Sequence, residues 1–206
     1  MKIYIIILTL ISYCTACNSQ ENITYQLVGG ACEGCEAIFE YGERLLAPSD
    51  TLIDFSLPGT KLKISGTVYQ DDENSPAKDV IIYIYHTNQS GIYPTNGDEK
   101  GWARRHGYIR GWMKTDDAGR YSFYTLKPGT YPSRDEPAHI HITILEPNGK
   151  YYWIESYIFD DDPLIKDKDI SHLRGGGSNI LKLQMEDDLW VGNRDIILGK
   201  NVPGYK

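Results

Sequence analysis

Short runs of alternating or β-branched residues, separated by turn residues, constrain the fold of this chain most strongly. The run 80–86, Val-Ile-Ile-Tyr-Ile-Tyr-His, is rich in β-branched and aromatic residues, which indicates a buried strand. The run 120–125 alternates large and polar side chains, the pattern of a half-buried strand. Further strands are predicted at 61–69, 139–145, 151–159, 180–185 and 190–198. Short strands divided by Gly, Pro and Asp turns predict an all-β fold, an antiparallel β-sandwich.

The first 17 residues have the pattern of an export signal. A short positive start precedes an apolar stretch at 3–11 that is too short to span a bilayer. Small residues before Cys17 resemble a bacterial lipoprotein signal cleaved before that cysteine, although Cys14 stands where leucine is usual. The alternative is an ordinary secretory signal cleaved nearby. In both cases we expect an exported protein, periplasmic or at the outer membrane or cell surface, and lipidation of Cys17 would anchor it to a membrane without spanning it.

Residues 18–58 are expected to form a tether and an irregular N-terminal extension, and residues 59–206 the sandwich. The extension contains the pair Cys32 and Cys35, for which an oxidising compartment favours a local disulfide. A redox-active pair is the alternative. A zinc site is disfavoured because no second C-x-x-C pair follows in the mature chain. The run 36–46 is a candidate short helix, weakened by Gly42.

Two histidines, His139 and His141, lie two residues apart in the predicted strand 139–145. Side chains alternate across a strand, so both point to the same face. Their Cα atoms are then about 6.6 Å apart, which allows both imidazoles to reach one metal ion. This signal is weak alone, because a strand can carry two exposed histidines by chance.

Two tyrosines strengthen the prediction of a metal site. Tyr93 lies in Gly-Ile-Tyr-Pro and Tyr131 in Gly-Thr-Tyr-Pro, so each is placed between turn residues. A phenolate is a hard anionic ligand that suits trivalent iron better than zinc or cuprous copper. A nearby cation also favours deprotonation of a phenol, whose ordinary pKa is about 10. The alternative is that both are turn tyrosines that pack over the end of the sandwich.

The order of these motifs resembles the intradiol ring-cleavage dioxygenases, which include catechol and protocatechuate dioxygenases. The run 110–123 resembles the family's segment before its second tyrosine ligand, and it leads through 125–132 into Pro-Ala-His-Ile-His at 137–141. Upstream, 80–93 resembles the strand and loop that end at the first tyrosine ligand. Downstream, 158–164 resembles the segment after the histidines. The resemblance implies a β-sandwich of the intradiol dioxygenase type.

The resemblance also implies a function and a ligand set. One ferric ion would be bound by Tyr93, Tyr131, His139 and His141 together with a hydroxide or water, with Tyr131 and His141 axial and the other two equatorial. The partners would be a small aromatic diol and O2, and the ring would be cleaved between its two hydroxyl-bearing carbons to a cis,cis-muconate-type diacid. Tyr131 would leave the metal and help to take a substrate proton, while the metal serves as Lewis acid and template.

Some positions depart from the family pattern. Many members have an arginine directly before Pro-Ala-His-Ile-His, where this chain has Glu136. A carboxylate there would oppose stabilisation of negative charge on the activated ring. Arg134 and Arg110 are the candidate catalytic replacements. Tyr85-His86 stands where better-known members have Trp-Gln, and we expect His86 to be a partly buried strand histidine rather than a ligand.

The connection between Tyr93 and Arg110 permits two interpretations. Its larger side chains either rim the pocket or belong to a solvated loop: Trp102, Arg104, Arg105 and His106.

Two other functions are kept as alternatives. The first is a non-catalytic exported β-sandwich lipoprotein that binds a ligand or glycan and has a vestigial metal site, which the departure at Glu136 favours. The second is a zinc or copper protein built on His-x-His, which the tyrosine pair disfavours. The formal net charge of -7 gives no indication of a nucleic-acid-binding surface. The sequence defines neither the catechol nor the oligomeric state.

Overall fold

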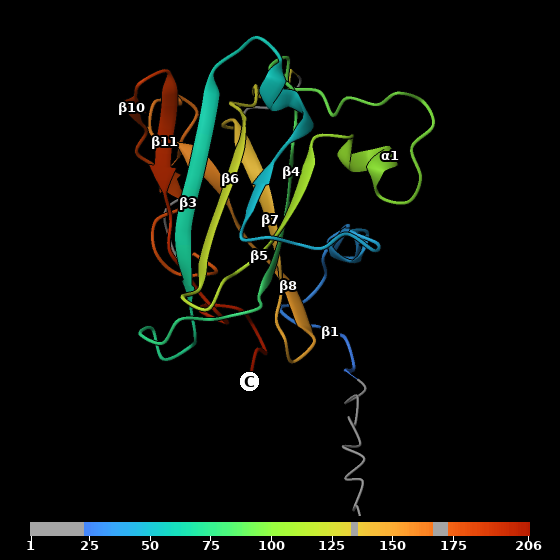
Figure 1. Ribbon diagram of the computed structural model, residues 1–206, viewed down its shortest axis with the longest axis vertical. Coiled ribbons are helices and arrows are strands. Elements are labelled where there is room, and N and C mark those ends of the chain that lie inside the picture. The colour runs from blue at the N-terminus through green and yellow to red at the C-terminus, as the bar shows by residue number, and fades with distance from the viewer. Residues whose placement is uncertain (1–22, 133–135, 167–172) are drawn as a thin grey trace, which may run out of the picture.

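The computed structural model describes residues 23–132, 136–166 and 173–206 (Figure 1). Within these residues, two six-stranded sheets form the two layers of a sandwich. The first sheet has the order β1 (Gln26–Leu27), β8 (Lys150–Phe159), β7 (His139–Leu145), β4 (Ile81–His86) and β5 (Arg110–Lys114), with β9 (Ile180–Leu181) beside β8. The second has the order β10 (Gln184–Glu186), β11 (Leu189–Asn193), β3 (Lys61–Tyr69), β6 (Arg120–Leu126) and β2 (Ser49–Thr51), with β12 (Ile196–Ile197) beside β3.

The main core lies between the two sheets and follows from strand alternation. Ile64 on β3 faces inward and pairs in register with Phe123 on β6. Alternate residues of β7, Ile140, Ile142 and Ile144, are buried in the same core. The side chains between them, including both histidines, therefore lie on the outer face of the first sheet.

The prediction of an all-β sandwich is confirmed, and the pairing within its sheets is mixed. The central pairs are antiparallel: β3 with β6, and β4 with both β5 and β7, and β7 with β8. Parallel pairs occur where short strands join these central ones: β1, β2, β9, β11 and β12. Parallel neighbours need long connections, and these short strands come from segments distant in sequence from their partners or joined to them by long loops.

Residues 23–58 pack closely on the sandwich. They supply β1, β2 and two 3-10 helices, η1 (Cys35–Phe39) and η2 (Ile53–Ser56). The candidate helix at 36–46 is therefore shorter than predicted and begins one residue earlier. A disulfide joins Cys32 and Cys35, as predicted.

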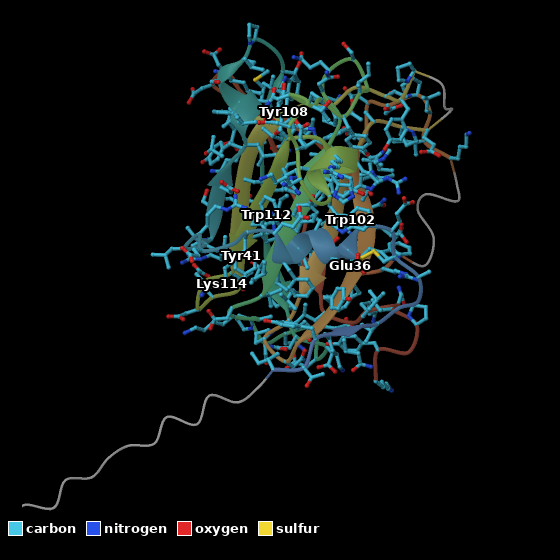
Figure 2. The ribbon with its side chains drawn as sticks, turned by 90° about the vertical axis from the view of Figure 1, so that its right-hand side faces the viewer. Glu36, Tyr41, Trp102, Tyr108, Trp112 and Lys114 are labelled. Atoms are coloured by element: carbon cyan, nitrogen blue, oxygen red, sulfur yellow. A yellow bond between two sulfur atoms is a disulfide. The ribbon has the colours of Figure 1, made fainter. Side chains whose placement is uncertain are left out.

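A second apolar cluster lies on the outer face of the first sheet, beneath η1. We call it the outer-face cluster; its buried members are Ala37, Ile38, Tyr83, Trp112 and Leu145. The Trp112 indole N–H donates a hydrogen bond to the Ile38 carbonyl at 3.1 Å. Figure 2 looks at this side of the molecule, with the short blue coil of η1 in front of the strands. The extension thus covers the sheet face that also carries the two histidines.

The helix α1 (Ala103–His106) lies outside the first sheet, on the side away from β3 (Figure 1). Among the described residues, no helix is long and apolar enough to cross a membrane. The predicted export signal and the lipidation site at Cys17 lie outside the described residues.

Candidate metal centre

Two glycine turns bring the two predicted tyrosines together. Tyr93 follows β4 and Tyr131 follows β6, so they come from different sheets. Gly91 has φ +74° and lies so close to the backbone of Thr130 that a Cβ would come within 1.9 Å of its carbonyl oxygen. Gly129 is similarly tight against Gln89, and its N–H donates to the Asn88 carbonyl at 2.9 Å. Side chains at these glycines would push the two Tyr-Pro loops apart.

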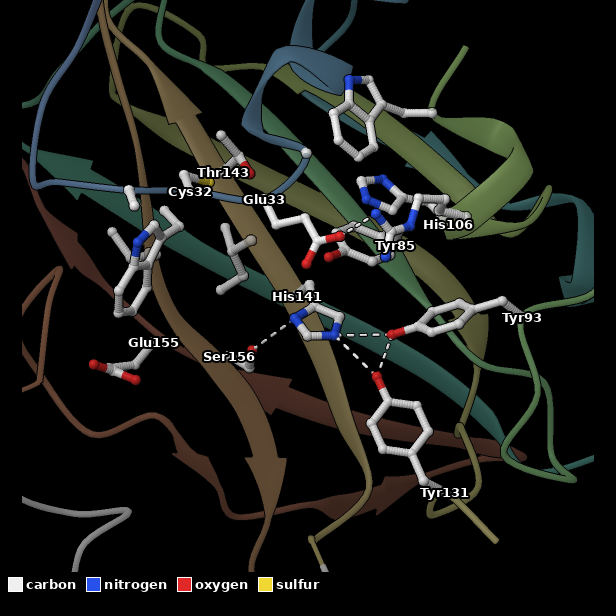
Figure 3. A pocket seen from close by; sticks show the side chains of 17 residues that line it. Cys32, Glu33, Tyr85, Tyr93, His106, Tyr131, His141, Thr143, Glu155 and Ser156 are labelled. Atoms are coloured by element: carbon white, nitrogen blue, oxygen red, sulfur yellow. Dashed lines mark hydrogen bonds and ion pairs between the residues drawn. The ribbon is translucent and has the colours of Figure 1, made fainter. Parts of the chain in front are cut away.

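The side chains of all four predicted ligands converge. His139 Nε2 lies 3.1 Å from His141 Nε2. His141 Nε2 also lies 2.9 Å from Tyr93 Oη and 3.3 Å from Tyr131 Oη. The two tyrosine hydroxyls are in hydrogen-bond contact with each other. Figure 3 shows the contacts among His141, Tyr93 and Tyr131. We call these four atoms the donor cluster.

The donor cluster fits a metal ion chemically. His139 Nδ1 lies 2.8 Å from the Pro137 carbonyl, so it donates its proton there and Nε2 carries a lone pair. A neutral imidazole binds a metal ion through such a lone pair, so His139 Nε2 can serve as a ligand. Ligands about 2.0–2.1 Å from one metal ion lie about 3 Å apart when adjacent, close to the separations seen here. Two imidazoles with two phenols are a donor set suited to ferric iron.

Electrostatics keep His141 and Tyr93 neutral when no cation is bound. Burial, helped by electrostatic repulsion from His139, lowers the pKa of His141 well below its ordinary value, so the imidazole keeps a lone pair. Burial, together with the hydrogen bond to Tyr131, raises the pKa of Tyr93 well above its ordinary value. A bound cation would reverse the effect on the phenol, because it favours the phenolate. Metal binding should therefore release protons from this site.

A bulge in β8 shapes the site opposite His141. Ile140 pairs with Tyr157 while Ile142 pairs with Ile154, so β8 has one extra residue at this point. Bulges turn side chains away from the regular alternation and are common beside functional sites. Here Ser156 Oγ comes within 3.4 Å of His141 Nδ1, on the side of the ring away from the donor cluster.

A cavity of about 520 Å³ opens beside the donor cluster, a size that holds small organic ligands. Its floor includes Tyr85, which pairs in register with His141 across β4 and β7 and stacks on that ring at 4.4 Å. The other face of Tyr85 stacks on His106 at 3.7 Å. The lining residues come from four parts of the chain: the disulfide loop (Ala31, Cys32, Glu33, Gly34), the region of α1 (Trp102, Arg105, His106), β7 (His141, Ile142, Thr143) and the β8 bulge (Trp153, Ile154, Glu155, Ser156), besides Tyr85, Tyr93 and Tyr131.

The two predicted catalytic arginines are not part of this lining. Arg110 forms an ion pair with Glu40 at 2.6 Å and lies over the ring of Trp112. It does not line the cavity. Arg134 lies outside the described residues. Glu136, which stands where an arginine was expected from the resemblance to many family members, is exposed and does not line the cavity.

The structure also places His86 and the large side chains between Tyr93 and Arg110, which were predicted either to rim the pocket or to lie in a solvated loop. His86 is buried away from the cavity, with Nε2 2.7 Å from the Thr125 hydroxyl and Nδ1 2.7 Å from the Thr87 carbonyl, as expected of a strand histidine. Trp102 and His106 rim the cavity, as does Arg105. The C-x-x-C pattern predicted the disulfide, but it did not predict that the disulfide loop lines the cavity.

Among the described residues, no group of three or more His, Cys, Asp or Glu side chains could hold a metal ion. The donor cluster is a set of another kind, with two histidines and two tyrosines.

Comparison with known proteins gives a consistent result. A family model described as "Dioxygenase" matches residues 47–190, more than two-thirds of the chain. The protocatechuate 3,4-dioxygenase beta chain of Burkholderia cepacia is 28% identical over 116 residues, which cover 52% of this chain and 48% of that protein. The catechol 1,2-dioxygenase of Candida albicans is 27% identical over 106 residues, which cover 44% of this chain and 33% of that protein. The matched region thus spans about half or less of these relatives.

A solved structure gives the same fold. The dioxygenase domain of a dioxygenase carbohydrate-binding protein fusion from Streptomyces sp. SirexAA-E superposes with a TM-score of 0.55 at 21% identity. The superposition covers 77% of this chain and 94% of that domain. At this identity the likeness concerns the fold alone.

Proposed function

The chain belongs to the intradiol ring-cleavage dioxygenase family, and on that premise we propose that it holds one ferric ion and cleaves a catechol-type ring with O2. The observation that carries the proposal is the convergence of Tyr93, Tyr131, His139 and His141 beside a cavity open to a small ligand. When bound, the ion would supply Lewis-acid activation and templating of the diol.

The residues have distinct tasks in this proposal. Tyr93, Tyr131, His139 and His141 would hold the ion. Tyr131, a phenolate while it holds the ion, would take the proton of a diol hydroxyl at its phenolic oxygen as the substrate binds and become a neutral phenol. The cavity takes the aromatic ring, with Tyr85 as part of its floor and α1 as part of its rim. The side chains of the cavity wall stack on one another and several lie on strands, so they can hold a flat aromatic ring in one orientation. A fixed orientation lowers the entropic part of the activation barrier for the reaction.

The test is an iron assay with a visible spectrum on the purified chain lacking residues 1–17. We expect about one iron per chain and a broad tyrosinate-to-ferric band that shifts when catechol is added, since an open position beside the metal admits the diol. His141→Ala should lose the iron, because it removes the nitrogen at the centre of the donor cluster. Oxygen uptake with formation of a diacid would complete the assignment.

A protein that stays colourless after ferric reconstitution would overturn the proposal. It would favour the alternative of a non-catalytic exported β-sandwich that binds a ligand or glycan. Full iron occupancy in His141→Ala would overturn the ligand set.

We also propose that the protein acts outside the cytoplasm, with Cys17 as the first residue of the mature lipidated chain. The Cys32–Cys35 disulfide supports this proposal, because such bonds persist in oxidising compartments. The mass of the mature protein from its native host decides between a lipidated N-terminal cysteine and a simple secretory cleavage.

A further inference from the structure

The loop 31–35 forms one wall of the cavity beside the donor cluster. Ala31, Cys32, Glu33 and Gly34 all line the cavity, although they lie far from the donors in sequence. Figure 3 shows Cys32 and Glu33 on the segment that passes over β7 and β8, facing His141 across the cavity. We call residues 31–35 the disulfide loop.

One end of the disulfide loop is fixed to the sheet. The disulfide ties Cys32 to Cys35, the first residue of η1, and Cys35 is only 1% exposed. The Thr143 hydroxyl donates weakly to Cys35 Sγ at 4.0 Å. Thr143 is two residues from His141 on the same face of β7 and lines the same cavity. The disulfide therefore lies against β7, the strand that carries the two histidine donors.

The other side of the disulfide loop meets α1. Gly34 has φ +85° and lies so close to His106 that a Cβ would come within 2.5 Å of Nε2. Glu33 forms an ion pair with Arg105, and both side chains border the cavity. The loop thus joins β7 to α1 and closes the cavity between them.

We propose that the disulfide loop is a substrate-positioning wall, and that the Cys32–Cys35 bond sets the affinity for the aromatic diol without contributing to metal binding. This rests on the proposed function. None of the four donors lies on the loop, so the metal site does not depend on it directly. A loop that is already held in its bound conformation loses less conformational entropy when a ligand binds against it. Removing the disulfide should therefore weaken ligand binding.

The test compares iron-loaded proteins in anaerobic titrations with catechol, followed by the shift of the visible band. Without O2 the ring is not cleaved, so the titration reports affinity alone. In the double variant Cys32→Ser/Cys35→Ser we expect the Kd to rise about fivefold to tenfold, the effect of ordering one or two extra side chains. Iron content and the band before catechol is added should match the parent protein. Thiol labelling of the parent verifies that its disulfide is intact.

A milder pair of variants separates positioning from folding. Glu33→Gln breaks the ion pair with Arg105 at an exposed position and leaves the disulfide intact. Glu36→Gln is the matched control, because Glu36 is also exposed and lies three residues away but does not line the cavity. We expect a smaller rise in Kd for Glu33→Gln and none for Glu36→Gln.

An unchanged Kd in the iron-loaded double serine variant would overturn the inference and leave the disulfide as a structural staple. If that variant does not fold, Glu33→Gln decides: a Kd equal to that of Glu36→Gln overturns the inference, and a higher one supports it. Failure of the proposed function is distinguishable, since a parent protein without iron would show no visible band to titrate.

Discussion

At the scale of single residues, position rather than residue type separates the donors from their neighbours. Tyr85, Tyr93 and Tyr131 all line the cavity. Burial raises the pKa of both Tyr85 and Tyr93 above the ordinary phenol value, so acidity does not distinguish them. What differs is where each oxygen lies: Tyr93 Oη is 2.9 Å from His141 Nε2, whereas Tyr85 meets the His141 ring through its face.

This difference gives a matched pair of variants. Tyr93→Phe removes an oxygen from the donor cluster, so we expect weaker iron binding and loss of much of the tyrosinate-to-ferric band. Tyr85→Phe removes a hydroxyl from the same cavity and keeps the stacked ring, so we expect iron content and colour like the parent. Iron analysis and visible spectra of the two variants test the prediction. Equal loss of colour in both would mean that Tyr85 also binds the metal.

The sequence was informative about the donors because their chemistry is local. The alternation of a strand puts His139 and His141 on one face, and the glycines before Tyr93 and Tyr131 signal tight turns. What the sequence did not reveal depends on distant contacts. Arg110 was a candidate catalytic residue, but its pairing with Glu40, seventy positions earlier in the chain, could not be foreseen.

At the scale of elements, the strands of the main core were predicted well and the edges poorly. β3 and β7 have the predicted bounds, because their alternation is regular. β5 was not predicted as a strand, since Gly111 interrupts its pattern, and Asp50 and Leu52 occupy the space where a side chain would lie. The predicted strands at 180–185 and 190–198 each divide into two short strands. β9 and β10 pair with different partners, β8 and β11, whereas β11 and β12 pair with successive parts of β3.

The helix α1 places a buried titratable group at the rim of the cavity. His106 is buried between Tyr85 and Trp102, and its Nδ1 lies 2.8 Å from the Tyr83 hydroxyl. Burial, followed by the charges of Arg110 and Arg105, lowers the pKa of His106 to about 4. The ring is therefore neutral in the folded protein near pH 7.

The lowered pKa predicts acid sensitivity. Between pH 7 and pH 5 the unfolded chain protonates His106 at its ordinary pKa of about 6.5, while the folded protein does not. The free energy of unfolding should decrease as the pH is lowered from 7 to 5. His106 should account for about 1–2 kcal/mol of that decrease. His106→Gln should show a smaller drop in unfolding free energy from pH 7 to pH 5, measured by urea denaturation. Parallel pH curves for variant and parent would contradict this account.

At the scale of the whole molecule, the site lies where the N-terminal extension crosses the sandwich. The strand β7 and the loops after β4 and β6 supply the four donors, but the wall of the cavity and the outer-face cluster both need residues 31–46. The extension was expected to be irregular, and its local sequence gives no strong helix or strand pattern. Its structure comes from apolar contacts with Tyr83, Trp112 and Leu145, which no local pattern encodes.

If the extension is integral to the fold, one substitution within it should destabilise the whole protein. Ile38 on η1 is 0% exposed in the outer-face cluster, so Ile38→Ala leaves a cavity there and should cost about 2–5 kcal/mol. Leu45, on the same segment, is 100% exposed, and Leu45→Ala should change stability by no more than about 0.5 kcal/mol. Denaturant unfolding, followed by the fluorescence of the tryptophans, which include the buried Trp112, measures both. A cost for Ile38→Ala no larger than that for Leu45→Ala would mean that the extension detaches without unfolding the sandwich, and the wall of the cavity would then be a separable part of the molecule.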